Sequence, residues 1–219
     1  MSEPSQVTVI IPCRNEAGSL AGVLEAIPTG YTALVVDNGS DDDTAAVAHQ
    51  RGARVVHEPT AGYGSAVHAG IEAARTPIVC VLDGDGSLDP GELPILVDLV
   101  QTGADLAVGR RMPVRGSGWP LHARVGNASI AAQLRWKYGL PVHDIGSMRA
   151  IRRDVLLGLG VTDRRSGYPL ELLIRAGQAN LRIEERAVTY RPRTAGRSKV
   201  SGSVLGSAVA AWDFFRVMR

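Results

Sequence analysis

Residues 78–87 read Ile-Val-Cys-Val-Leu-Asp-Gly-Asp-Gly-Ser. The apolar run predicts a buried strand, and two carboxylates, Asp83 and Asp85, follow it one residue apart. Like charges this close repel each other unless a cation lies between them. Mg²⁺ or Mn²⁺, held by carboxylate oxygens and shared with phosphate, is the commonest such cation. Gly84 and Gly86 leave room for a ligand to approach the backbone. The alternative interpretation is a polar turn at the end of a strand.

Strand and helix patterns alternate on both sides of this motif. Strands are predicted at 7–11, 33–36, 54–57, 78–82 and 105–109, with helices near 20–27, 64–74 and 93–100 and an alanine-rich helix that starts near residue 44. This order predicts an α/β fold with a mostly parallel sheet that helices cover on both faces. Polar clusters at 12–16, 37–43 and 83–87 each follow a strand. Ligands of such sheets bind beyond the carboxyl ends of the strands, so these clusters mark the expected site.

The second half of the sequence has a different pattern, with basic loops between its predicted helices and strands. We expect a basic, glycine-rich loop at 110–118, a helix at 121–138, a loop at 139–147, a helix after residue 149, another at 168–178 and a strand at 181–190. A basic loop at 191–199 and an amphipathic segment at 204–219 complete the chain. Cations are numerous in this half, and arginine suits phosphate because its planar fork bonds two oxygens at once.

Composition sets further limits. The chain has 219 residues and a net charge of +2, so the bulk charge argues against nucleic acid as a partner. The two cysteines, Cys13 and Cys80, lie in or just after apolar runs and are expected to be buried and reduced. No signal-peptide pattern and no window of eighteen apolar residues is visible, which predicts a cytoplasmic protein, soluble or peripheral to a membrane.

Two further motifs allow more than one interpretation. Asp37 ends a strand and could accept hydrogen bonds from a nucleoside, whereas the acids at 41–43 are better read as the start of a helix. The turn around Gly62 and Gly64 precedes a helix, where free backbone amides can hold phosphate, but a plain helix start fits equally well. His143 next to Asp144 lacks a third partner, which argues against a nucleophile triad.

In this order, the motifs resemble those of family 2 glycosyltransferases of the GT-A fold, above all dolichol-phosphate mannosyltransferases and other polyprenyl-phosphate glycosyltransferases. The segments that carry the resemblance are Val-Ile-Ile-Pro-Cys-Arg-Asn-Glu (9–16), Val-Val-Asp-Asn-Gly-Ser-Asp-Asp-Asp-Thr (35–44), the glycine-rich turn 62–64, Asp-Gly-Asp (83–85), Asp-Ile-Gly-Ser-Met-Arg-Ala (144–150), Glu171 and Tyr-Arg-Pro-Arg-Thr-Ala-Gly-Arg-Ser-Lys (190–199). The pattern departs from the family at Met148, which replaces an aromatic residue, and at Ser87, where relatives often have a glutamine that contacts the metal.

The resemblance implies a role for each matching residue. The metal ligands would be Asp83 and Asp85, and the catalytic residues Asp85, Asp144, Arg149 and Glu171. Contacts to the nucleotide sugar would come from Pro12, Arg14, Asn15, Glu16, Asp37, Gly62, Gly64, Asp83, Gly84 and Arg110. The acceptor and its phosphate would be held by Arg124, Ser147, Arg193, Arg197, Ser198 and Lys199. A single domain would comprise a nucleotide-sugar-binding half (1–109), an acceptor-side half (110–200) and a C-terminal helix (201–219).

The implied reaction is metal-dependent, inverting transfer of mannose or glucose from GDP-mannose or UDP-glucose to a polyprenyl or dolichyl phosphate. A phosphate acceptor needs no strong base, whereas a soluble hydroxyl acceptor would need one, with Asp144 or Glu171 as the candidate. Two rival hypotheses are a phosphatase of the haloacid dehalogenase type, with Asp83 as nucleophile, and an inactive nucleotide-sugar-binding regulator. Both account for fewer of the motifs.

The terminal segment 204–219 could bring the enzyme to a lipid acceptor. Leu205, Ala208, Trp212 and Phe215 share one helical face, with Arg216 and Arg219 at the end. Such a helix can lie in the headgroup region of a bilayer. The same face could instead pack on the protein's own core or on the partner in a homodimer.

Overall fold

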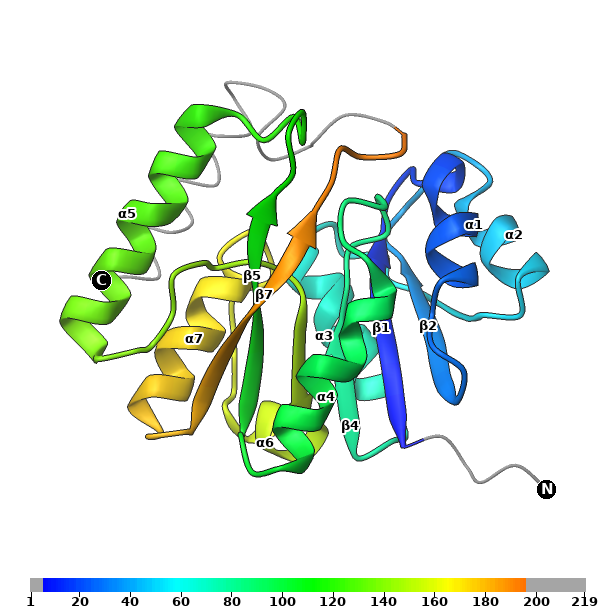
Figure 1. Ribbon diagram of the computed structural model, residues 1–219. Coiled ribbons are helices and arrows are strands. Elements are labelled where there is room, and N and C mark those ends of the chain that lie inside the picture. Colours follow the sequence, from blue (N-terminus) through cyan, green and yellow to red (C-terminus); the bar gives the residue numbers. More distant parts are fainter. Residues whose placement is uncertain (1–5, 196–219) are drawn as a thin grey trace.

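A seven-stranded sheet forms the centre of the computed structural model, which describes residues 6–195 (Figure 1). The strands are β1 (Val7–Cys13), β2 (Tyr31–Asp37), β3 (Arg54–His57), β4 (Ile78–Val81), β5 (Leu106–Pro113), β6 (Arg149–Arg152) and β7 (Ile183–Tyr190). Their order across the sheet is β3-β2-β1-β4-β6-β5-β7. All neighbours are parallel except β6, which is antiparallel to both β4 and β5. The predicted mostly parallel sheet is confirmed.

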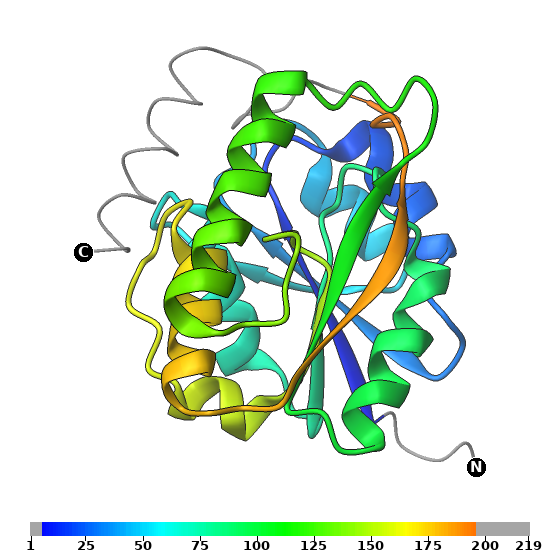
Figure 2. The same ribbon diagram turned by 60° about the vertical axis from the view of Figure 1, so that its left-hand side comes forward.

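Helices cover both faces of the sheet. They are α1 (Ala17–Glu25), α2 (Thr44–Gln50), α3 (Tyr63–Ala73), α4 (Leu93–Gln101), α5 (Leu121–Tyr138), α6 (Arg153–Gly158) and α7 (Tyr168–Gln178), with a short 3₁₀ turn at Pro90–Glu92. The two faces bury separate cores because neighbouring strand residues point to opposite sides. One core packs against α3, α5, α6 and α7, and the other against α1, α2 and α4. Figure 2 shows α4 on the opposite side of the sheet from α5 and α7.

The second half departs from the sequence prediction in two strands. β5 continues to Pro113 because β7 pairs with it in parallel over its whole length, from Leu106 opposite Ile183 to Pro113 opposite Tyr190. Residues 110–113, expected in a loop, are therefore strand. β6 was not predicted, and the helix expected after residue 149 begins only at Arg153. Figures 1 and 2 both show β5 and β7 side by side.

This topology brings the carboxyl ends of β1, β2 and β4 to one edge of the sheet, the upper edge in Figure 1. The ends of β5 and β7 lie on the same side. Residue 109 lies inside β5, and the proposed division of the domain at this residue stays a prediction. The expected helix at 201–219 lies outside the described residues. Within residues 6–195, no helix is both long enough and apolar enough to span a membrane.

Candidate active site

The paired acids lie where the sequence predicts, directly beyond β4. Asp85 is buried, and its Oδ1 accepts a 2.8 Å hydrogen bond from the backbone N of Ser87. Its Oδ2 lies 2.8 Å from Nη2 of Arg193. The Oγ of Ser147 donates a 2.6 Å hydrogen bond to Oδ2 of Asp83. Residues far apart in the sequence, Ser147 and Arg193, are thus brought to the two carboxylates, whereas their predicted role, contact with the acceptor phosphate, stays a prediction.

The electrostatics of this pair favour a bound cation. Burial is the largest influence on Asp83 and raises its pKa from 3.8 to about 6, with the neighbouring charge of Asp85 acting in the same direction. The hydrogen bond from Ser147 and the charges of Arg193 and Arg111 act in the opposite direction but do not cancel the rise. Without a further positive charge, Asp83 therefore holds its proton more tightly than an exposed aspartate.

The chain after β7 crosses over the acid-bearing turn. The backbone N of Arg191 donates to the carbonyl of Ser87 at 2.8 Å, and the backbone N of Thr194 donates to the carbonyl of Asp85 at 3.1 Å. Gly86 has φ 74°, and a Cβ there would lie 2.1 Å from Oγ1 of Thr194. Glycine at this position therefore allows residues 191–195 to rest on the turn.

The predicted nucleoside-binding turns after β1 and β2 are joined to each other. Asn15 has φ 54°, its backbone N donates to Oγ of Ser40 at 3.0 Å, and its Oδ1 accepts from the backbone N of Asp41 at 2.7 Å. The backbone N of Glu16 donates to Oγ1 of Thr44 at 2.9 Å. Pro12 pairs with Val36 in the sheet, and Arg14 is exposed.

Asp37 lies at this same edge of the sheet, at the end of β2. It is buried, with Oδ1 accepting from the backbone N of Ser40 at 3.1 Å and Oδ2 lying 3.2 Å from Nδ1 of His57. Both oxygens thus have protein partners, so contact with a nucleoside would share or replace them. The helix start expected at 41–43 is held by Asp42, whose carboxylate accepts from the backbone N of Thr44 and of Ala17.

The glycine-rich turn 62–64 does not hold phosphate in the way suggested. The backbone N of Gly62 donates to Oδ1 of Asn38 at 2.8 Å, and that of Gly64 donates to the carbonyl of Arg165 at 3.1 Å. These amides are therefore not free for an anion. A Cβ on Gly62 would lie 2.1 Å from the carbonyl O of Arg164, and one on Gly64 would lie 2.6 Å from that of Asp163. The two glycines are required for close packing against residues 163–165.

Gly84 is also required for packing, but beside the acids. A Cβ on this residue would lie 2.5 Å from Oε2 of Glu16 and 2.7 Å from Sγ of Cys13. Its carbonyl accepts a 2.8 Å hydrogen bond from Oγ of Ser19. Cys13 and Cys80 are both buried free thiols, as predicted. The absence of a side chain at Gly84 therefore places the turn that carries Asp83 and Asp85 directly against the turn after β1.

Sequence reasoning missed the role of Arg111. Its Nε and Nη2 donate to the two oxygens of buried Asp144 at 2.8 and 2.7 Å, and its guanidinium lies 4.2 Å from the ring centroid of Trp119 and 5.7 Å from that of Tyr190. Successive strand residues point in opposite directions, and Arg110, the predicted ligand, is exposed. Had β5 been predicted to extend through residue 113, the alternation of side chains along it would have placed Arg110 and Arg111 on opposite faces of the sheet.

Arg149 and Glu171 make their described contacts within the protein itself, and their catalytic roles stay predictions. Three nitrogens of buried Arg149 donate to the carbonyls of Gly146, Pro169 and Ile145 at 3.0–3.1 Å, which braces the loop that carries Ser147. Glu171 accepts hydrogen bonds from the backbone N of Thr162 and Asp163, from Oγ1 of Thr162 and from Nε of Arg175. Its carboxylate thereby holds the loop that packs on Gly62 and Gly64.

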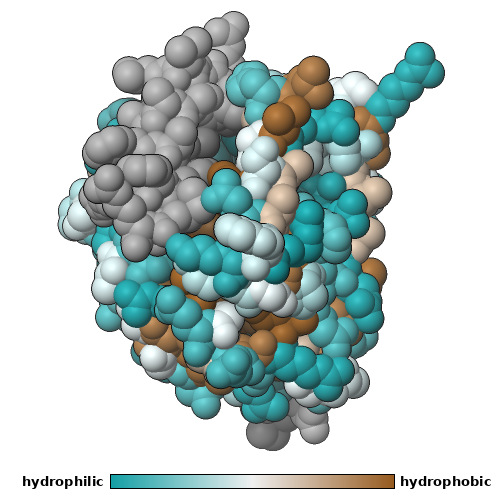
Figure 3. Space-filling model, turned by 90° about the vertical axis from the view of Figure 1, so that its left-hand side faces the viewer, coloured by the Kyte–Doolittle hydropathy of each residue, from teal (hydrophilic) through white to brown (hydrophobic). Residues whose placement is uncertain are grey.

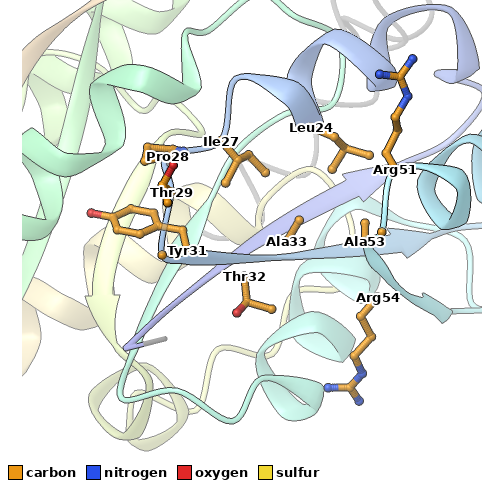
Figure 4. Close-up of a pocket in the computed structure, with 12 residues that line it drawn as sticks. Leu24, Ile27, Pro28, Thr29, Tyr31, Thr32, Ala33, Arg51, Ala53 and Arg54 are labelled. Carbon is orange, nitrogen blue, oxygen red and sulfur yellow. The ribbon is translucent and has the colours of Figure 1, made fainter. Parts of the chain in front are cut away.

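The remaining predicted acceptor contacts are not assembled with these groups in the described structure. Arg124 is exposed on α5. Arg197, Ser198 and Lys199 lie outside the described residues. A separate pocket of about 440 Å³ lies near the amino ends of β2 and β3, whereas the acids lie beyond a carboxyl end (Figure 4). Its two arginines are engaged elsewhere, Arg51 with Glu25 and Arg54 with the carbonyl of Ala73, so we assign it no function.

A paired-acid turn at the carboxyl edge of a mostly parallel sheet, with arginines directed at it, is the arrangement expected of a sugar transferase that uses nucleotide donors. The chain belongs to the family 2 glycosyltransferases, because the family model "Glycosyl transferase family 2" matches residues 8–160. This membership makes the protein an enzyme of the glycosyltransferase class and overturns the phosphatase hypothesis.

Individual relatives agree with this assignment. An uncharacterized glycosyltransferase of Mycobacterium tuberculosis is 60% identical over 212 residues, which are 97% of this chain and 97% of that protein. The polyprenol monophosphomannose synthase of Mycolicibacterium smegmatis is 35% identical, with 95% of this chain and 88% of that protein covered. The crystal structure of glucosyl-3-phosphoglycerate synthase from M. tuberculosis with Mn²⁺, UDP and glucosyl-3-phosphoglycerate has a TM-score of 0.78 at 21% identity, covering 97% of this chain and 78% of that one. The last likeness confirms the expected GT-A fold.

Proposed function

We propose that this enzyme transfers a hexose, mannose or glucose, from a nucleotide diphosphate sugar to the phosphate of a polyprenyl lipid, with inversion at the sugar. The relative from M. smegmatis, a polyprenol monophosphomannose synthase by name, supports a lipid phosphate as acceptor. The observation that carries the proposal is the hydrogen bonding of the two carboxylates that could act as a base. Asp144 and Glu171, the two candidate bases, are both fully engaged with donors of the protein itself.

This engagement favours an acceptor that is already an anion. A hydroxyl acceptor must lose a proton during attack and needs a base within hydrogen-bond reach. Asp144 accepts three hydrogen bonds from Arg111 through both oxygens, so its charge is balanced and most of its accepting capacity is used. A phosphate acceptor requires cations to orient it and to offset its repulsion from the donor diphosphate. Arg193 lies next to the acids and can supply that charge when it exchanges Asp85 for phosphate, whereas the charge of Arg111 is paired with Asp144.

The donor set fits Mg²⁺ or Mn²⁺. Two adjacent carboxylates offer hard oxygen ligands, and the described part of the chain has no cluster of three or more side chains that could form a complete metal cage. Mg²⁺ is commonly held by one or two carboxylates together with substrate phosphates. Glucosyl-3-phosphoglycerate synthase, the structural neighbour, has been crystallised with UDP and either metal. Such an ion, when bound, would neutralise charge that develops on the leaving diphosphate.

The residues of this chain then have distinct tasks. Asp83 and Asp85 would hold the cation, and Ser147 orients Asp83 through its 2.6 Å hydrogen bond. Asp37 and the turn 12–16 contact the nucleoside. Arg193 pairs with Asp85 and must exchange this contact for one with phosphate when donor and metal arrive. The charge on Asp85 is thus balanced both before and after the donor binds.

A second candidate function is transfer to a small soluble phosphorylated acceptor, because glucosyl-3-phosphoglycerate synthase has the same fold over 97% of this chain. The test is a donor panel that includes GDP-mannose and UDP-glucose, each offered with a polyprenyl phosphate or with 3-phosphoglycerate. We expect labelled sugar in the organic extract with one donor, and none in EDTA. Asp85→Asn should lower turnover at least ~100-fold because metal stabilisation of the leaving group contributes several kcal/mol.

The matched control is Asp98→Asn, which removes an exposed carboxylate on α4. This variant should keep wild-type turnover. Label that appears only in the aqueous phase, and only with 3-phosphoglycerate, would assign the soluble acceptor. Full activity of Asp85→Asn in EDTA would exclude the metal-dependent mechanism for either acceptor.

A further inference from the structure

The outward face of α5 carries an apolar stripe that the fold does not bury. Leu121, Val125 and Trp136 are 73%, 57% and 87% exposed. Exposed Ala128 and Ala132 lie between them, so these five residues follow one another at i, i+4, i+7, i+11 and i+15 on a single helical face. Exposed large apolar side chains are few in the described chain, and most of them fall between Met112 and Trp136. We call these five residues the α5 stripe.

The α5 stripe is separate from the face with which the helix joins the protein. Ala131 and Leu134 are buried, and the partly buried Ile130 packs against the same core. On this inner side, Oδ1 of Asn127 accepts from the backbone N of Ile145 at 3.2 Å and from Nη2 of Arg111 at 3.4 Å. The core therefore accounts for one face of α5 only. Packing on the core does not explain why the opposite face is also apolar.

The charged residues in the stretch of sequence that includes the stripe are of one sign. Residues 106–143 contain six lysines and arginines and no aspartate or glutamate, although the whole chain has almost balanced charge. Arg124, Arg135 and Lys137 belong to α5 itself, and Arg115 precedes it. Figure 3 looks onto this side of the molecule, where hydrophobic and hydrophilic side chains are interspersed. A protein partner would have to supply only acids, whereas an anionic bilayer offers negative headgroups and an apolar layer together.

We propose that the α5 stripe and its flanking cations dock the enzyme on an anionic lipid bilayer. The helix would lie in the headgroup region, with Leu121, Val125 and Trp136 directed into the acyl boundary. This position would also place the active site at the membrane surface, since Trp119, two residues before α5, packs on Arg111 and Tyr190. All the residues of this contact belong to the described body of the protein.

The test is flotation of the full-length protein with vesicles of phosphatidylglycerol and phosphatidylcholine, compared with phosphatidylcholine alone. We expect binding to the anionic vesicles that weakens as salt is raised, because surface charges are screened. Val125→Ser combined with Trp136→Ser should lower partitioning at least ~10-fold through lost apolar burial. Arg124→Gln combined with Lys137→Gln should lower it by about fivefold for each charge. The matched control is Ile95→Ser on α4, an equally apolar and 48% exposed site that should not change binding.

The remaining outcomes overturn the proposal. If Val125→Ser/Trp136→Ser floats like the wild type while Leu205→Ser/Trp212→Ser/Phe215→Ser does not, the terminal segment makes the membrane contact. If no vesicle is bound and Val125→Ser/Trp136→Ser converts a dimer into a monomer in light scattering, the stripe is an interface between copies. Flotation needs no sugar donor or acceptor. Its result is therefore separate from the result of the acceptor assay.

Discussion

Replacement of Asp83 by asparagine should make the metal-free protein more stable at alkaline pH, although the variant loses a proposed metal ligand. The pKa of Asp83 is about 6 in the folded protein against 3.8 for an ordinary aspartate, chiefly through burial and secondarily through Asp85. At about 1.4 kcal/mol per pH unit, ionised Asp83 costs the folded state up to about 3 kcal/mol. Asparagine removes this cost and can still accept the hydrogen bond from Ser147.

The pH dependence gives the prediction its sign. Below pH 4, Asp83 is protonated in the folded and unfolded states, so the wild type and the variant should be similarly stable. As pH rises from 4 to 6, the unfolded chain releases this proton first, and the wild type loses stability relative to Asp83→Asn. Above pH 7 the difference is complete. For a chain of this size it corresponds to a melting temperature about 6–12 °C higher for the variant.

Thermal unfolding in EDTA from pH 4.5 to 8.5 measures this difference, with exposed Asp41→Asn as the control that should not change the profile. Mn²⁺ at pH 8 should reverse the order, because it stabilises only a protein that binds it. Metal affinity should also weaken by up to about tenfold per pH unit below pH 6, since the proton and the metal compete for Asp83. An Asp83→Asn variant that is less stable than the wild type in EDTA at pH 8 would refute the reasoning. The positive charges of Arg193 and Arg111 would then already offset the negative charge of Asp83 and Asp85.

Two further predictions concern packing around the site. Gly84→Ala places a methyl group within 3 Å of Cys13 and Glu16. We expect the free energy of unfolding to fall by about 1–3 kcal/mol and metal binding to weaken in titration. The control is Gly22→Ala, in open space within α1, which should not destabilise the protein. Glu171→Gln should lower the melting temperature, because Glu171 accepts hydrogen bonds from Asp163 and Arg175, while turnover changes only a few-fold. A ~100-fold fall in turnover with unchanged stability would instead make Glu171 a catalytic base.

Sequence reasoning predicted the first half of the fold well because most strands there contain an uninterrupted run of apolar residues, as in β1, β2 and β4. The exceptions are segments that contain polar residues but form strands because neighbouring strands pair with them. β6 is only four residues long with an arginine at each end, and it is a strand because β4 and β5 flank it on both sides. The polar end of β5 is extended because β7 pairs with it as far as Pro113.

At the site, motifs identified the acids and singled out Ser147 and Arg193, but as acceptor contacts and not as the partners of the acids that the structure shows. They did not distinguish Arg111 from Arg110, because the choice depends on the direction of a strand whose length was underestimated. Nor did they explain Gly62, whose neighbour in space is a loop about a hundred residues later. A pattern along the chain shows that glycine is required but not which segment approaches it.

The place of β6 in the sheet has a consequence for how the chain folds during synthesis. β5 cannot join the first four strands directly, because residues 149–152 must first be inserted between β4 and β5. Until that stretch has left the ribosome, β4 is an unpaired edge of apolar residues, Ile78–Val81, and such edges are prone to pair with other chains. A fragment that ends before residue 149 should therefore aggregate, even though it contains both of the paired acids. We therefore expect the first half of the chain to depend on the second half for its solubility.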